Sequence, residues 1–109
     1  MTQLEILQMI GDVITEIDVG RGSLLPDDRN RRQLDDLRIL LDDRQRQLSR
    51  ATFDDNTQQF QDAAQGLQAI NKQIQGNIQS VDDIQATLDN VSKFLSAVTT
   101  LISTIGPFV

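Results

Sequence analysis

Adjacent aspartates are the side chains whose type and spacing come nearest to a pattern for chemistry. They occur at positions 27/28, 35/36, 42/43, 54/55 and 82/83. Carboxylate oxygens are the ligands that Ca²⁺ and Mg²⁺ prefer, so such pairs raise the hypothesis of a cation site. Neighbouring residues on a helix point about 100° apart, however, and the chain contains no Asp-x-Asp-x-Asp-Gly loop. We therefore expect no metal site, and we interpret several of these aspartates as parts of helix caps.

The Gly20-Arg21-Gly22-Ser23 stretch raises the hypothesis of a phosphate-binding loop. It lacks the Lys-Ser/Thr pair of a P-loop and follows a predicted helix rather than a strand, so we interpret Gly20 as the left-handed C-cap of that helix. The chain also has no histidine, cysteine, tyrosine or tryptophan. Because these residues include the commonest general base and the commonest zinc ligands, we expect no catalytic site, no cofactor and no enzymatic activity.

Eight arginines lie between Arg21 and Arg50 among six aspartates, in a chain whose formal net charge is −6. A basic helix invites a nucleic-acid hypothesis, but most of these arginines have an acidic neighbour one turn away. The predicted pairs are Asp27 with Arg31, Asp28 with Arg32, Asp42 with Arg46, and Asp35 with Arg38. We therefore expect solvated helical ion pairs and no nucleic-acid partner.

The elements that must carry these residues are helices, and the second half of the chain shows this most clearly. From Phe53 to Ile105, apolar residues recur at heptad positions a and d, while both lysines, Lys72 and Lys93, fall on the opposite side. The flanking positions hold no Glu or Lys, and small residues at Ala64 and Gly66 would allow another backbone to approach closely. The apolar face is therefore wider than that of a two-stranded coiled coil, which predicts an all-α helical bundle.

The apolar face of the second half also supplies the candidate interaction residues. We predict that it forms an oligomer or partner interface. Its residues are Phe60, Leu67, Ile70, Ile74, Ile78, Val81, Ile84, Leu88, Val91, Phe94, Leu95, Val98, Leu101, Ile102 and Ile105.

We expect residues 1–109 to form a single all-helical domain. Two helices are predicted in its first half. Thr2 and Glu5 form a capping box for a helix over about 3–19. Pro26 suits the first turn of a second helix over about 27–50. Its leucines recur at the spacing of one buried face, and we expect Ile39 and Leu40 to widen that face.

The stretch 76–80 leaves two arrangements open. The heptad phase continues through it without a slip, which favours one helix over about 54–105 and an elongated helical hairpin. Such a hairpin would expose an apolar strip and would have to associate as a dimer, a ring or a filament. Gly76 and Asn77 are poor helix residues and Ser80 could cap a new helix, so the alternative is a turn at 76–80 in a compact four-helix bundle.

These patterns favour a non-enzymatic helical assembly or interaction protein, whose partner is a further copy of the chain or another helical protein. The alternative is a membrane-active protein, pore-forming or translocating, that uses the uncharged segment 94–109. That segment is short for a spanning helix and lacks a basic polar face, so we expect no transmembrane helix. The acidic start lacks the basic region of a signal peptide, which predicts a cytoplasmic protein or export by a signal-independent route.

Overall fold

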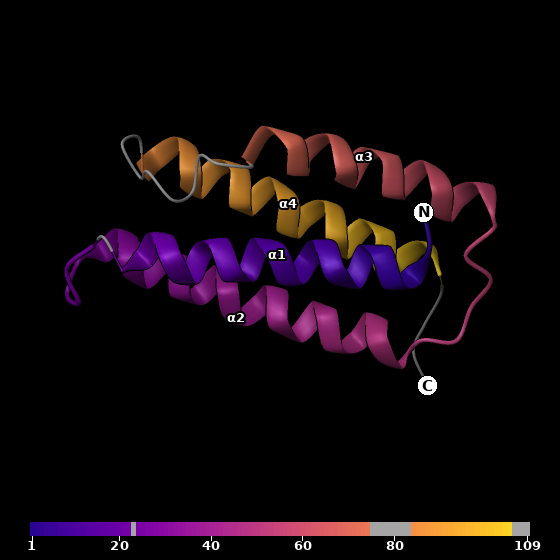
Figure 1. The fold of residues 1–109 in the computed structure, drawn as a ribbon, viewed down its shortest axis with the longest axis horizontal. Coiled ribbons are helices and arrows are strands. Elements are labelled where there is room, and N and C mark those ends of the chain that lie inside the picture. The colour runs from indigo at the N-terminus through magenta and orange to yellow at the C-terminus, as the bar shows by residue number, and fades with distance from the viewer. Residues whose placement is uncertain (23, 75–83, 106–109) are drawn as a thin grey trace.

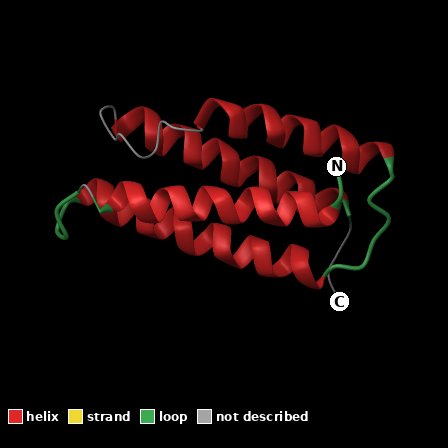
Figure 2. Ribbon diagram, in the orientation of Figure 1, coloured by secondary structure: helices red, strands yellow, loops and turns green. Residues whose placement is uncertain are grey.

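The computed structural model describes residues 1–22, 24–74 and 84–105. Within these ranges the chain forms four α-helices and no strand (Figures 1 and 2): α1 (Gln3–Arg21), α2 (Arg29–Arg50), α3 (Gln58–Ile74) and α4 (Ile84–Thr104). The predicted all-α class and the helical bundle are confirmed. Buried side chains from every one of these helices meet in a shared core.

The capping box at the start of α1 is confirmed. The Glu5 backbone N–H donates to Thr2 Oγ1 at 3.2 Å, and the Thr2 N–H donates to the Glu5 carboxylate at 3.1 Å. The prediction of a left-handed cap at Gly20 is wrong, because Gly20 lies buried inside the last turn of α1. The helix is capped by Gly22 at an ordinary right-handed φ of −64°. The Gly22 N–H reaches the Val19 carbonyl at 3.3 Å and closes the last turn.

The second helix begins later than the sequence predicts. Asp28 is the N-cap of α2, and its side chain accepts from the Asn30 N–H at 2.8 Å. Pro26 therefore precedes the helix instead of occupying its first turn. Leu34, Leu41 and Leu48 are fully buried, which confirms one leucine-lined contact face along α2.

The preferred single helix over 54–105 is wrong, and the four-helix alternative is the arrangement that the structure has. The segments of that expected helix, α3 and α4, lie side by side and antiparallel (Figure 1). A continuous helix would be about 75 to 80 Å long, whereas the longest extent of the molecule is 43 Å. The residues at 76–80 lie outside the described part of the chain. Pairing α3 with α4 covers their wide apolar faces within one chain, which a straight helix cannot do.

The helices form two antiparallel pairs that lie against each other. In Figure 1, α1 runs back along α2 and α3 runs back along α4. Between the pairs, α2 packs beside α4 with the same direction, and Arg44 Nε of α2 donates to Thr99 Oγ1 of α4 at 3.3 Å. The 51–57 connection crosses the end of the bundle where the N-terminus lies (Figure 1).

A cluster of hydrogen bonds joins the N-terminus to that connection. The Gln61 side-chain amide donates to the Met1 carbonyl at 2.7 Å, and the Gln3 N–H donates to the Asp55 carboxylate at 3.0 Å. The Gln3 side chain donates to the carbonyls of Leu48 and Ala51 at the end of α2. These contacts satisfy backbone groups that the helix end would otherwise leave without partners.

Candidate interaction surface

The predicted interface residues lie mainly in the core of the single chain. Nine are buried: Phe60, Leu67, Ile74, Leu88, Val91, Phe94, Val98, Leu101 and Ile102. Four are half-buried and pack against that core, namely Ile70, Ile84, Leu95 and Ile105, while Ile78 and Val81 lie outside the described residues. The described members are thus covered by neighbouring helices of the same chain. The elongated hairpin predicted from the sequence would have exposed an apolar strip that a second chain must cover. In the described part of the molecule, this strip is not exposed.

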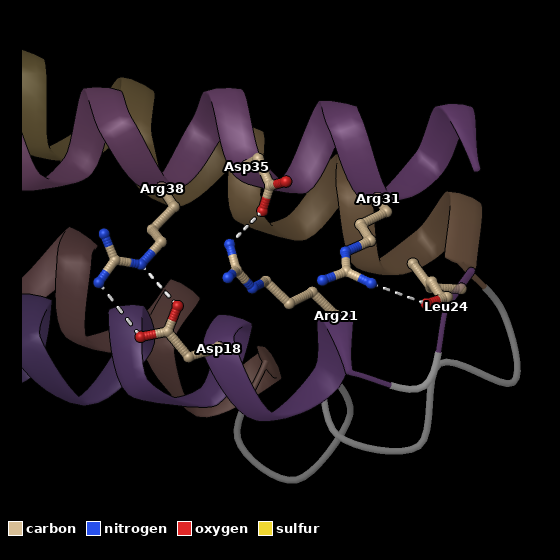
Figure 3. A network of polar contacts seen from close by, with 6 residues as sticks. All are labelled: Asp18, Arg21, Leu24, Arg31, Asp35 and Arg38. Carbon is tan, nitrogen blue, oxygen red and sulfur yellow. Dashed lines mark hydrogen bonds and ion pairs between the residues drawn. The ribbon is translucent and has the colours of Figure 1, made fainter. Parts of the chain in front are cut away.

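Ion pairs connect α1 to α2, whereas the sequence predicted ion pairs only between neighbours along the second helix. Arg38 Nε lies 2.6 Å from Asp18 Oδ1, and Arg21 Nη1 lies 2.6 Å from Asp35 Oδ1 (Figure 3). The predicted pair of Asp35 with Arg38 is therefore wrong, because each residue has a partner on α1. The four side chains hold the two helices in register at their shared surface.

Of the other three predicted ion pairs, one forms and two do not. Asp42 and Arg46 form the expected contact one turn apart. Arg31 instead donates to the Leu24 carbonyl at 3.1 Å, as Figure 3 shows. Asp28 is used as the helix cap, so its predicted pair with Arg32 is absent from the described ion pairs. Where a backbone group or a neighbouring helix competes, it displaces the local ion pair.

Among the described members of the aspartate pairs, Asp28 is the N-cap of α2, while Asp35, Asp42 and Asp43 take part in ion pairs. Asp54 accepts from the Asn56 N–H at 2.9 Å, and Asp43 lies 2.7 Å from Arg44. Among the described residues, no group of three or more His, Cys, Asp or Glu side chains is placed to hold a metal ion.

The large apolar side chains that remain exposed in the described ranges all belong to the first half of the chain. They are Leu4 and Val19 of α1, Leu25 of the connection, and Ile39 and Leu40 of α2. Their exposed fractions run from 42% for Leu40 to 71% for Leu25. The expectation that Ile39 and Leu40 widen the buried face is wrong. At about 100° per residue, Ile39 lies about 160° away from the buried Leu41.

The outer face of α2 combines these apolar residues with arginines that have no acidic partner. Among the described ion pairs, none includes Arg29, Arg32 or Arg50, and all three side chains are exposed. Helical spacing places them on the same side as Ile39 and Leu40. At its centre this outer face combines Ile39 and Leu40 with the exposed carboxylates of Asp36 and Asp43, and it is basic toward both ends.

The outer face of α1 has the opposite charge. Leu4, Gln8, Asp12 and Val19 are exposed, and helical spacing puts them along one line of the helix. Glu16 lies at the edge of that line and is half-buried. Burial of its carboxyl group, and then the nearby Asp12 carboxylate, raise the pKa of Glu16 above its ordinary value. The charge that α1 presents to solvent is thus carried mainly by acidic side chains.

After Lys93, the outer face of α4 carries hydroxyl groups and no charged side chain. Thr99, Thr100 and Ser103 are exposed, and their hydroxyls donate to carbonyls three or four residues earlier in the helix. Phe94 and Leu101 on the other side of α4 are buried. Within the described residues, no helix combines the length and the apolar character needed to cross a membrane.

Comparisons with protein-family models, with curated protein sequences and with solved structures gave no match to this chain. The outer residues of α1 and α2 were missed in the sequence because Ile39 and Leu40 fit a broad apolar stripe. The strict seven-residue spacing of Leu34, Leu41 and Leu48 was the signal that could have excluded them from it.

Proposed function

We propose that this protein is a non-enzymatic helical interaction module that associates with further copies of itself. The surface used is the outer face of the α1–α2 pair, rather than the apolar residues of α3 and α4 that occupy the core. The bundle acts as a rigid scaffold that presents this surface.

The observation that carries the proposal is the one-sided distribution of exposed apolar side chains. In the described ranges, α1, α2 and their connection hold all of the large exposed apolar residues, whereas the outer faces of α3 and α4 are mainly polar. Scattered exposed apolar residues are ordinary, but their concentration on one part of a surface marks interaction sites. The arginines without ion-pair partners lie two or more turns from Ile39 and Leu40, so charged residues flank these apolar ones, as they do at the rim of many interfaces.

The composition supports a role in binding rather than in catalysis. A chain without His, Cys, Tyr or Trp lacks most of the side chains that act as bases, nucleophiles or zinc ligands near neutral pH. Its net charge of −6 also opposes general attraction to nucleic acid.

A membrane-active role for segment 94–109 stays an alternative prediction. The hydroxyls of α4 already bond to their own helix backbone, which lowers the cost of leaving water. Against this, Phe94, Val98 and Leu101 are buried in the bundle, so contact with a bilayer would require the core to open. Leakage of dye from anionic liposomes, with Phe94→Ser as the matched variant, tests this alternative.

The test of the proposed function is sedimentation equilibrium over micromolar to millimolar concentrations. The wild-type protein should associate, and the double variant Ile39→Ser/Leu40→Ser should associate at least about tenfold more weakly because the apolar centre of the surface is lost. Ala69→Ser, on the exposed side of α3, is the control and should match wild type. A wild-type protein that stays monomeric over the whole range contradicts the proposal, as does equal association of the double variant.

A further inference from the structure

We propose that the outer face of α1 in one copy lies antiparallel on the outer face of α2 in a second copy, with Asp12 against Arg32. This inference deepens the function proposed above and rests on it. It names the second surface of the interface and the register in which the two surfaces meet.

Charge is the first reason to pair α1 with α2. A parallel contact between two α2 outer faces would oppose Arg29, Arg32 and Arg50 to the same arginines of the other copy, and an antiparallel contact centred on Ile39 and Leu40 would oppose Arg29 to Arg50. Contact between two α1 outer faces would oppose acidic side chains. Like charges that face each other across an interface cost free energy, whereas the α1-to-α2 contact opposes Asp12 to Arg32.

The second reason is that one antiparallel register opposes Leu4 to Leu40 and, two turns further on, Asp12 to Arg32. Each step of four residues moves by about one turn along the same side of a helix. Starting with Leu4 beside Leu40, the next step places Gln8 beside Asp36. The step after that places Asp12 beside Arg32, and the next one, at the edge of the line, brings the half-buried Glu16 toward the Asp28 cap of α2.

The same register also matches apolar residues at its far end. Val19 lies fifteen residues after Leu4, and Leu25 lies fifteen residues before Leu40. Val19 of one copy therefore reaches the connection before α2 in the other copy, where Leu25 is exposed. The contact thus covers the exposed Leu4 and Leu40 and brings the exposed Val19 toward the connection that holds Leu25.

The contacts inside one chain leave these residues available. The edge of α2 that faces its own α1 is occupied by Arg38 with Asp18, by Asp35 with Arg21, and by Gln45, whose amide donates to the Leu7 carbonyl at 3.0 Å. Neither Asp12 nor Arg32 takes part in the described ion pairs.

The contact joins two different surfaces. When two copies meet, the α2 face of one copy and the α1 face of the other therefore stay unused. Contacts of this head-to-tail kind continue until they close into a ring or extend as a filament. The register inside the chain, with Asp18 opposite Arg38, differs from the register proposed between chains, with Asp12 opposite Arg32. The offset moves each added copy along the helix axis, which favours open growth over a closed pair.

The test is charge exchange, followed by sedimentation velocity on the full chain. Asp12→Arg and Arg32→Glu should each weaken association at least about fivefold, because each turns an attraction into a repulsion. The double variant Asp12→Arg/Arg32→Glu should recover association, and so should an equimolar mixture of the two single variants. Lys72→Glu makes the same charge change as Arg32→Glu on exposed α3 and should match wild type. Circular dichroism and thermal unfolding confirm that each variant keeps its fold.

The outcomes separate this inference from the function on which it rests. If the protein associates through Ile39 and Leu40 but the single charge variants match wild type, the register is wrong and the proposed function stands. If both single variants weaken association and neither the double variant nor the mixture recovers it, Asp12 and Arg32 do not face each other. Absence of association in the wild-type protein overturns both proposals.

Discussion

Arg38 of α2 donates two hydrogen bonds to the carboxylate of Asp18 on α1. Nε lies 2.6 Å from Oδ1 and Nη2 lies 3.2 Å from Oδ2. The hydrogen bond to Asp18 is also the largest cause that raises the pKa of Arg38. The contact links α1 to α2 in their antiparallel register, while the buried Leu34, Leu41 and Leu48 set which side of α2 faces outward.

The Asp18–Arg38 contact should contribute a measurable but modest coupling energy. The two side chains are 42% and 34% exposed, so solvent screens their attraction. We expect a coupling of about 0.5 to 1 kcal/mol in a double-mutant cycle with Asp18→Asn and Arg38→Gln, measured by urea unfolding at low salt. The value should fall in high salt. A coupling of zero at low salt would mean that the pair does not hold α1 against α2.

Leu41 and its neighbour Leu40 should respond differently to truncation. Leu41 is fully buried, whereas Leu40 is 42% exposed. Leu41→Ala should lower the free energy of unfolding by about 2 to 4 kcal/mol, and Leu40→Ala should lower it by less than about 1 kcal/mol. Chemical denaturation of the monomer measures both. Similar losses for the two variants would show that α2 is rotated from the orientation described above.

Glu16 should make the protein less stable at neutral pH than it would be with a neutral side chain. Because its pKa is raised in the folded state, the folded protein binds more protons than the unfolded chain between the ordinary pKa and the raised one. Stability is therefore lost as the pH rises through that interval. Glu16→Gln should raise the free energy of unfolding at neutral pH, by no more than about 1 kcal/mol since the carboxyl is only partly shielded.

The pH comparison is the control for Glu16→Gln. Below the ordinary pKa of a glutamate, wild type and variant should have the same stability, because the carboxyl is then protonated in both folded and unfolded wild type. A gain in stability that persists unchanged at acid pH would point to a cause other than the charge of Glu16.

We expect that replacing Gly66 with alanine stabilises the bundle. A Cβ built there meets nothing within 4 Å, although the sequence suggested close approach of another backbone. Gly66→Ala should raise the free energy of unfolding by about 0.5 to 1 kcal/mol, because glycine loses more backbone entropy on folding. Gly11→Ala is the contrasting variant, since its Cβ would lie 3.3 Å from the Gln45 amide nitrogen and offset the gain. A loss of self-association in Gly66→Ala would instead place a partner on α3.

Much of the helical content could be predicted from local signals. Thr2 and Glu5 marked the start of α1, and the heptad positions of Phe60 and Leu67 marked the buried face of α3. Both depend on residues within one or two turns. Helical periodicity of this kind reports which side of a helix is buried, as it does for α3, whereas Ile39 and Leu40 of α2 show that the width of that side is not read from it.

The arrangement of the helices could not be predicted in the same way. Heptad phase is the same whether two segments are collinear or folded against each other, so it did not reveal that α3 packs on α4. The partner of Asp35 was missed for a related reason. Arg38 is the local candidate, but Arg21 is brought to it from another helix. Contacts between helices depend on the register of packing, which short-range spacing does not encode.

The most direct test of the central claim is a series of ¹⁵N-¹H correlation spectra of the wild-type protein over increasing concentration. Shift and intensity changes should concentrate on the outward residues of α1 and α2, with Leu4, Asp12, Arg32 and Ile39 among them, while the outer faces of α3 and α4 should change little. Changes that instead centre on α3 and α4, or spectra that stay the same up to millimolar protein, would contradict the claim that this chain acts through the outer surface of its first two helices.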